Sequence, residues 1–304
     1  MKHYIKLFFA AAVAALGLAS CAKEVAPVET PKDNLVTVHF GATAGIEGAT
    51  KATLTPNEQE TLFTSAWENG DKIFIQYEND KTTATTTTGT WNGTKFEATM
   101  PSYTGMWEYT ACYPNPANAE ISFGTNRTQK GNLYNSNYDV MIAPKISCDH
   151  ADAGKDDSGN DVVFNMERQT GIVYFHLKSE LNNEDVISAK LSVEGGNIAS
   201  SYTLLGPSGF TCEEDLKEIT ITFEEGTAPK ASDFQLWYNV LPTAYTSMSL
   251  EVKTANHTLT LNKNKGGNFV AGKLYKIHKD NVTWTENKNG LTCKVPCLSY
   301  PKIL

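Results

Sequence analysis

The sequence predicts an all-β chain, built from two tandem antiparallel β-sandwich domains that follow a signal peptide. Short segments rich in β-branched and aromatic residues recur at near-regular spacing, with Gly, Pro and Asn between them. Helical periodicity is almost absent, and the one candidate helix, Leu181 to Val186, is too short to be stable. The 304 residues are enough for two domains of ordinary size.

The first residues have the pattern of an exported lipoprotein. A short charged start is followed by an apolar run from Leu7 to Leu18, and Leu18-Ala19-Ser20-Cys21 closes the segment. This order is typical of a secretory signal, and the run is short for a membrane span. The last four residues resemble a bacterial lipobox, in which the cysteine is lipidated and the peptide is cut before it. An ordinary secretory signal with a chance cysteine is the alternative.

A lipobox implies that residues 1–20 are removed and that Cys21 carries the lipid anchor. Several acyl chains hold a protein durably at a membrane, whereas one chain binds only marginally. Residues 21–34 are polar, contain Pro27 and Pro31, and are expected to form a flexible tether. We therefore expect the chain to be anchored at the outer membrane through Cys21 and to project from the cell surface.

Composition excludes several classes of function. The formal net charge is −8, and Arg127 and Arg168 are the only arginines. Because the chain has no patch of positive charge that could bind a phosphate backbone, nucleic acid is excluded as a partner. P-loop, His-Glu-x-x-His and glycine-fingerprint motifs are absent, and Gly206-Pro207-Ser208-Gly209 lacks the spacing of a nucleophile elbow. The sequence therefore predicts no catalytic residues, no metal site and no cofactor.

The cysteines beyond Cys21 do not form a recognisable site. Their spacings fit neither zinc ligation nor a redox motif, and their number is odd. We expect buried or half-buried free thiols at these positions, which are Cys112, Cys148, Cys212, Cys293 and Cys297.

The first domain is expected over residues 35–155 and begins with a strand from Leu35 to Ala44. Val36, Val38 and Phe40 share one face of this strand. The following loop ends at Lys51, a natural site for a trypsin-like cut before Ala52. Two Asn-Gly pairs mark tight turns, and threonine is β-branched and favours strands. Further strands are expected over residues 72–77, 82–90, 95–100, 106–113 and 138–143.

The segment from Asp149 to Asp161 is rich in Asp and Gly and is interpreted as a solvated surface loop. Calcium binding is the alternative, but the acids do not occupy the alternating positions of a twelve-residue calcium loop. This loop separates the first domain from a second domain over residues 156–285. Strands are expected there over residues 162–166, 171–177, 186–193, 200–204, 218–223, 234–241, 247–253, 257–261 and 274–284.

Three further features have alternative interpretations. Tryptophan and tyrosine are frequent and could stack on sugars, but most lie at core-facing positions, and only Trp91 is expected to be exposed. His39, His176 and His257 lie in predicted strands and are expected to be solvated. The tail over residues 286–304 is either a donor strand or a disordered end, and its alternating apolar residues are Leu291, Cys293 and Val295.

Several motifs occur in an order that resembles the fimbrillin family, the lipoprotein pilins of type V fimbriae. After the lipobox come Lys51-Ala52-Thr53-Leu54 and Trp67-x-x-Gly70-Asp71-Lys72-Ile73. Leu241-Pro242-x-x-Tyr245 and Ala271-Gly272-Lys273-Leu274-Tyr275 follow late in the chain. The resemblance covers most of the chain after Cys21, and it implies two Greek-key, transthyretin-like β-sandwiches.

The family also implies a mode of assembly. A protease cuts after the first strand, and the vacated groove accepts a strand from the next subunit. Here the lost strand would carry Val36, Val38 and Phe40, and the cut would follow Lys51, where the family pattern has arginine. The partners implied are other fimbrial subunits. The alternative is an uncut monomeric surface lipoprotein that binds a glycan or a host protein.

Overall fold

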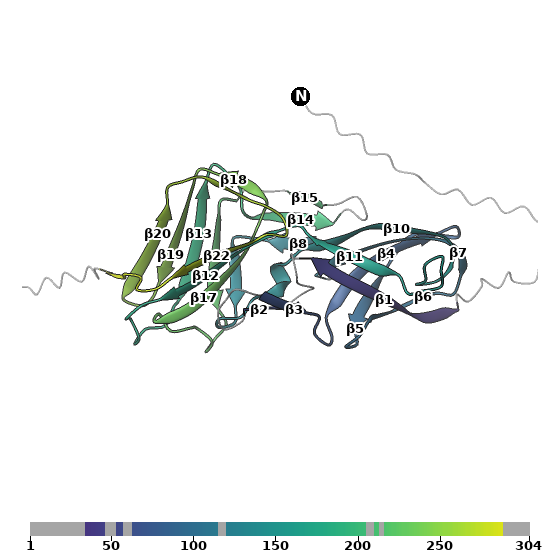
Figure 1. Ribbon diagram of the computed structural model, residues 1–304, viewed down its shortest axis with the longest axis horizontal. Coiled ribbons are helices and arrows are strands. Elements are labelled where there is room, and N and C mark those ends of the chain that lie inside the picture. The colour runs from purple at the N-terminus through teal and green to yellow at the C-terminus, as the bar shows by residue number, and fades with distance from the viewer. Residues whose placement is uncertain are drawn as a thin grey trace, which may run out of the picture. The chain divides into compact units, whose positions relative to one another are not determined.

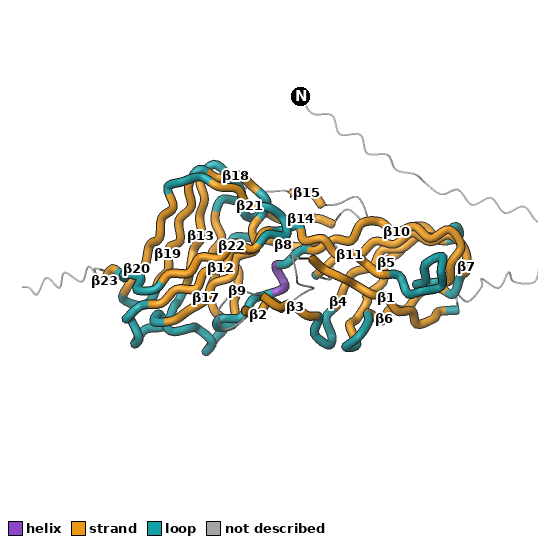
Figure 2. Tube along the Cα trace, viewed as in Figure 1, coloured by secondary structure: helices purple, strands orange, loops and turns teal. Residues whose placement is uncertain are grey.

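The computed structural model describes residues 34–45, 53–56, 63–114, 120–204, 210–212 and 216–287. All the elements among these residues are strands except one 3-10 turn, Ser136–Tyr138 (Figure 2). The all-β prediction is therefore confirmed. The chain from Leu35 onward forms one compact unit. No helix in these ranges is long and apolar enough to cross a membrane.

The strands from the first half of the chain form a closed barrel (Figure 1). Its strand order is β1-β11-β10-β7-β4-β5-β6, and β6 pairs with β1 to close it. Closure removes exposed sheet edges, which are otherwise available for pairing with other chains. The strands are β1 (Leu35–Gly45), β4 (Lys72–Asn79), β5 (Thr82–Trp91), β6 (Phe96–Pro101), β7 (Thr104–Tyr113), β10 (Met141–Asp152) and β11 (Val163–Arg168).

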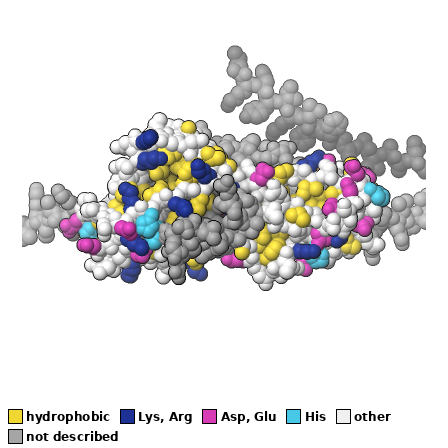
Figure 3. All heavy atoms as spheres, in the orientation of Figure 1, with side chains coloured by type: hydrophobic (Ala, Val, Ile, Leu, Met, Phe, Trp, Pro, Cys, Tyr) yellow, Lys and Arg dark blue, Asp and Glu magenta, His cyan; other side chains and the backbone are white. Residues whose placement is uncertain are grey.

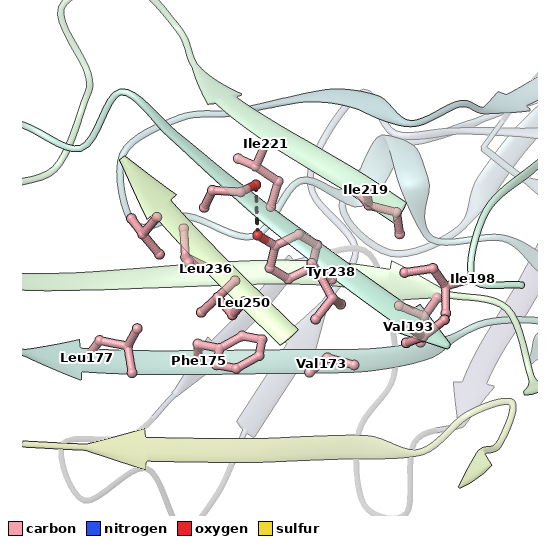
Figure 4. Packing of buried hydrophobic residues seen from close by; sticks show 14 of the residues in the cluster. Val173, Phe175, Leu177, Val193, Ile198, Ile219, Ile221, Leu236, Tyr238 and Leu250 are labelled. Atoms are coloured by element: carbon pink, nitrogen blue, oxygen red, sulfur yellow. Dashed lines mark hydrogen bonds between the residues drawn. The ribbon is translucent and has the colours of Figure 1, made fainter. Parts of the chain in front are cut away.

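Most of the later strands form two sheets around a second core. One sheet has the order β17-β12-β22, and the other has the order β23-β20-β19-β13-β16-β9. Figure 4 shows apolar side chains from both sheets packed together in this second core, which is called the rear core below. Within it, the Tyr238 hydroxyl donates to the Ala189 carbonyl at 2.9 Å. The strands are β9 (Asn126–Gln129), β12 (Gly171–Lys178), β13 (Ser188–Glu194), β16 (Glu218–Phe223), β17 (Asp233–Val240), β19 (Ser247–Lys253), β20 (His257–Lys263), β22 (Leu274–Lys279) and β23 (Thr285–Glu286).

Three small sheets complete the described structure. They are β15-β14-β8, β18-β21 and β2-β3. Their strands are β2 (Thr53–Pro56), β3 (Phe63–Ala66), β8 (Glu120–Phe123), β14 (Ser200–Leu204), β15 (Phe210–Cys212), β18 (Thr243–Tyr245) and β21 (Gly267–Phe269). β8 and β9 lie between two barrel strands in sequence, yet they pair with β14 and β16 respectively.

Local predictions from turns and composition are confirmed. Gly70 and Gly93 both have positive φ, as the two Asn-Gly turns require. The threonine-rich segment is strand β5, and it pairs antiparallel with β4. The acidic segment is shorter than expected, because β10 continues through Asp149 to Asp152. The predicted boundary at residues 155/156 stays a prediction, and β11, which follows it, pairs with β1 and β10 in the barrel sheet.

Candidate functional site

Strand β1 is the element on which the functional hypothesis depends, and it is inserted between two neighbours. Its first half, Leu35–Phe40, pairs antiparallel with β6. Its second half, Gly41–Gly45, pairs parallel with β11. The change of partner occurs at Gly41, whose N–H donates to the Val162 carbonyl at 2.9 Å. A Cβ on Gly41 would lie only 3.0 Å from the Val163 side chain, so glycine allows this close approach.

Two of the three apolar residues predicted to share the inner face of β1 lie in the barrel core. Val38 is buried, and Phe40 is fully buried. The Phe40 ring stacks on Phe164 of β11 at 5.2 Å between centroids and meets Tyr109 edge-on at 5.6 Å. Val36 lies nearer the start of the strand and is 36% exposed, so it contributes little to this packing.

A tight turn after β10 supports β1 from inside the barrel. Gly154 has φ +74, and a Cβ at this position would lie 2.7 Å from the Val38 side chain. Its N–H donates to the buried Tyr109 hydroxyl at 2.9 Å. Burial raises the pKa of Tyr109 and keeps its hydroxyl protonated at neutral pH. The turn and the tyrosine therefore fix the surface against which Val38 packs.

The walls that contact β1 are apolar. Phe96, Ala98 and Met100 line the β6 side, and Phe164 and Met166 line the β11 side, all of them buried. If β1 left, these side chains and the backbone N–H and C=O groups of both neighbours would be exposed together. Unpaired strand edges beside an apolar stripe are a template for another strand. The arrangement can therefore hold a β-strand.

The remaining residues of the strand-exchange hypothesis lie outside the described ranges. These are the lipidation residue, the two residues flanking the cut, and the alternating residues of the tail: Cys21, Lys51, Ala52, Leu291, Cys293 and Val295. Their roles stay predictions.

The structure corrects two histidine predictions. His176 is buried, and its Nε2 lies 2.7 Å from an Asp233 carboxylate oxygen. His257 is half-buried, with Nδ1 2.9 Å from an oxygen of Glu184. The His39 side chain is 42% exposed, and its Nε2 lies 3.4 Å from an oxygen of Glu97. A single sequence does not reveal which carboxylate will face a strand histidine.

The prediction of an exposed Trp91 is wrong. Its ring is half-buried, with the Phe96 ring 5.0 Å and the Trp67 ring 6.2 Å away between centroids. The Asn-Gly turn after Trp91 folds β6 back so that Phe96 pairs directly with it. The indole therefore completes the barrel core, and it is a poor platform for stacking on a sugar.

The acidic turn binds backbone and lysine groups of its own chain. The Asp156 carboxylate accepts the N–H groups of Ser158 and Asn160, both at 2.9 Å. Asp161 pairs with Lys155 and Lys95, and the pKa of its carboxyl is lowered by the hydrogen bond from Lys155 and then by that from Lys95. Within the described ranges no group of three or more His, Cys, Asp or Glu is placed to hold a metal ion.

Cys112 and Cys148 are buried free thiols, as predicted. Burial raises the pKa of Cys112 to about 12, so this thiol is protonated and unreactive at neutral pH. The side chain of Cys212 and the whole of Cys293 and Cys297 lie outside what the structure describes.

Sequence reasoning missed the partners of β1. The strand predicted over residues 162–166 was not linked to β1, and β11 is the parallel neighbour of β1. Gly41 was the available signal, because a glycine inside a strand often marks a close backbone approach or a change in pairing.

Comparisons with known proteins give only distant likenesses. No family model matches the chain, and no curated protein matches it. A solved structure named a putative cell adhesion protein, from Bacteroides uniformis, is 20% identical with a TM-score of 0.49, covering 84% of this chain and 98% of that one. Another so named, from Bacteroides ovatus, is 14% identical with a TM-score of 0.47 and covers 83% and 96%. A fimbrial protein from Bacteroides ovatus is 13% identical with a TM-score of 0.39 and covers 80% and 49%. With TM-scores below 0.5, these likenesses establish neither the fold nor the function of this chain.

Proposed function

We propose that the chain is a structural and adhesive subunit of a surface fimbria, exported as a lipoprotein and assembled by strand exchange. In this proposal Cys21 holds the precursor at the outer membrane, and a protease cuts between Lys51 and Ala52. The cut releases β1, and a strand from another fimbrial subunit takes its place. The two Greek-key, transthyretin-like sandwiches implied by the resemblance to fimbrillins belong to the same proposal.

The observation that supports this proposal most is the position of β1. Its first half is hydrogen-bonded to β6 and its second half to β11, and it buries Val38 and Phe40, so the barrel core is incomplete without it. It precedes the predicted cut site at Lys51, so one hydrolysed peptide bond separates it covalently from every other described strand. Burying a large apolar side chain contributes about 1.5–3 kcal/mol, which an incoming strand must match for each of the two.

The donor in this proposal is the tail that follows β23. Leu291, Cys293 and Val295 alternate and would face the core in the way that Val38 and Phe40 do. β23 itself, at the edge of its sheet, pairs with only two residues of β20. Among the described residues, only this two-residue pairing would be disturbed if the tail moved to another subunit.

Processing and assembly are tested in cells that carry the full-length gene. Mass spectrometry of the mature protein is expected to find an N-terminus at Ala52 in polymers and a lipidated Cys21 in precursors. Lys51→Ala is expected to abolish both the Ala52 terminus and the polymers. Lys130→Ala, which changes an exposed lysine far from this segment in sequence, serves as the matched control.

Each step has an outcome that contradicts it. Polymers made from chains that retain Cys21 and β1 exclude strand release at Lys51. Unchanged polymers after deletion of residues 291–304 exclude the tail as donor. A mature protein that is always monomeric and lipidated favours the alternative of a free-standing surface lipoprotein.

A further inference from the structure

A cleft opens along the side of the rear core, between the edge strand β22 of one sheet and β20 of the other. These two strands belong to different sheets and do not pair. The cleft has a volume of about 440 Å³. Ligand pockets commonly measure about 300–1,000 Å³ and combine apolar walls with a few polar groups. On the face shown in Figure 3, hydrophobic side chains gather in this part of the molecule, with Lys or Arg side chains around them.

The floor and one end of the cleft are apolar and aromatic. Val173 and Phe175 of β12 and Leu250 of β19 form the floor, and Figure 4 shows all three directed into the rear core. Tyr245 and Phe269 close one end, with ring centroids 4.7 Å apart. The floor residues are themselves buried, so a hydrocarbon chain lying here would replace water over the half-buried lining residues Leu261, Tyr275 and Ile277.

The aromatic end of the cleft is held in place before any ligand arrives. The Tyr275 hydroxyl donates to the Asn268 carbonyl and accepts the Val270 N–H, both at 2.8 Å. The Tyr275 ring meets Phe269 edge-on at 5.3 Å. A Cβ on Gly267 would lie 2.5 Å from the Tyr245 hydroxyl, so glycine lets β21 close against that ring. A preformed wall reduces the entropy lost on binding.

The rim of the cleft is positively charged in a chain that is acidic overall. Lys263, Lys276 and Lys279 line the cleft, and none of the described residues that line it is acidic. Lys279 pairs in register with the buried Leu177, so it occupies a core-facing position of β22. Lys263 occupies the same face of β20 as Leu261, and its Nζ lies 2.8 Å from the Tyr245 hydroxyl. β22 and β20 therefore each carry a lysine on the same face as their core-facing apolar residues.

We propose that this cleft binds a single-chain amphiphile of the fatty-acid class, with the hydrocarbon chain along the apolar lining and the carboxylate at a rim lysine, either Lys263 at the aromatic end or Lys279 four residues along β22 from Tyr275. The apolar floor and the charge complementarity together select an anion with an apolar tail. A lysine that points inward on an edge strand can also serve only to prevent pairing with other chains, and that role needs no ligand. The proposal does not depend on strand exchange at β1.

The binding test uses the full chain, produced without export so that Cys21 carries no acyl chain and purified without detergent. Isothermal titration with dodecanoate, below its micellar concentration, is expected to give saturable binding with one site per chain. Dodecyltrimethylammonium, which has the same tail and the opposite charge, is expected to bind about ten-fold or more weakly, equivalent to about 1.4 kcal/mol. Dodecyl phosphate distinguishes a requirement for carboxylate from a general preference for anions.

Variants locate the site. Lys263→Glu combined with Lys279→Glu is expected to weaken dodecanoate binding about ten-fold or more while leaving the melting temperature close to that of the parent. Lys190→Glu, on the outer face of β13 and 40% exposed, is the matched control and is expected to leave binding unchanged. Leu261→Trp is expected to fill the cleft and reduce binding without any change of charge.

Three results overturn the proposal. They are the absence of saturable dodecanoate binding, equal affinity for the cationic probe, and equal affinity of the rim double variant and the Lys190→Glu control. Any of these leaves the lysines with the role of blocking edge pairing. If dodecyl phosphate binds and dodecanoate does not, the carboxylate class is wrong.

Discussion

Substitution of two glycines in the turn after β10 distinguishes the cost of backbone strain from the cost of a steric clash with β1. Gly154 and Gly159 have nearly the same positive φ, +74 and +80. A Cβ on Gly154 would collide with Val38, whereas a Cβ on Gly159 would have no neighbour within 4 Å. Both substitutions by alanine impose the left-handed penalty of about 1–2 kcal/mol. Only the first also overpacks the core.

We expect Gly154→Ala to be less stable than Gly159→Ala by about 1–3 kcal/mol, the usual cost of overpacking. The measurement is urea unfolding of each variant beside the parent chain. Equal destabilisation would mean that the turn moves freely away from β1 and does not support it.

Glu184 links stability to pH. Its carboxylate accepts hydrogen bonds from Thr254, Asn256 and His257, and these lower its pKa from 4.5 to about 2, the Thr254 hydroxyl having the largest effect. Because the folded-state pKa lies below the unfolded value, the stabilisation is fully present above pH 4.5 and is lost as the pH falls toward 2.

Glu184→Gln is therefore expected to be less stable than the parent at neutral pH, with the difference shrinking as the pH falls below 4.5. Urea unfolding at a series of pH values measures this. The exposed Glu225→Gln is the control and is expected to follow the parent at every pH. A Glu184→Gln deficit that stays constant down to pH 2 would show that the carboxylate's charge is unimportant.

At the scale of single elements, β1 combines a buried centre and an exposed start. Phe40 is fully buried, whereas Val36 is 36% exposed. We expect Phe40→Ala to destabilise the chain by about 3–5 kcal/mol, because it leaves a cavity between Phe164 and Tyr109. Val36→Ala on the same strand is expected to change stability by less than about 0.5 kcal/mol. Chemical denaturation of both variants measures this, and a small effect of Phe40→Ala would mean that the barrel holds without β1.

The elements show what a sequence can and cannot specify. Turn chemistry and β-branched composition are local, so the hairpin around Asn92-Gly93 and the threonine-rich β5 were predictable from residues alone. Pairing between distant strands depends on the whole chain, and β8 and β9 lacked any strong local pattern. The burial of Trp91 and the carboxylate partners of His176 and His257 were hidden for the same reason, because each contact is made across a turn or between strands far apart in sequence.

For the whole molecule, the segment between β7 and β10 connects the two cores. β9 adds to β16 in parallel, and Arg127 of β9 donates to the Asn239 carbonyl at 2.6 Å. Gln129 accepts the Trp237 N–H at 3.0 Å. These hydrogen bonds tie the segment to the rear core, and the barrel is reached through a small apolar cluster in which Leu241, just after β17, packs against the buried Cys112 and Val140.

We expect the barrel and the rear core to unfold in one transition. Hydrogen exchange followed by mass spectrometry at rising urea is expected to remove protection from β7 and β17 at the same concentration. Arg127→Ala removes a buried hydrogen bond within the rear core, and in a single transition it is expected to lower that concentration for both strands. Loss of protection in two separate steps would mean that the cores are independent.

The mixed pairing of β1 gives its slot a direction. The slot requires a strand that runs antiparallel to β6 and parallel to β11. A strand inserted the other way round would lose both hydrogen-bond registers at once. If neighbouring copies fill one another's slots, every joint must therefore have the same orientation. The resulting filament would have two chemically different ends, one with an unfilled slot and one with an unused donor strand. A new subunit would therefore add to the two ends through different surfaces.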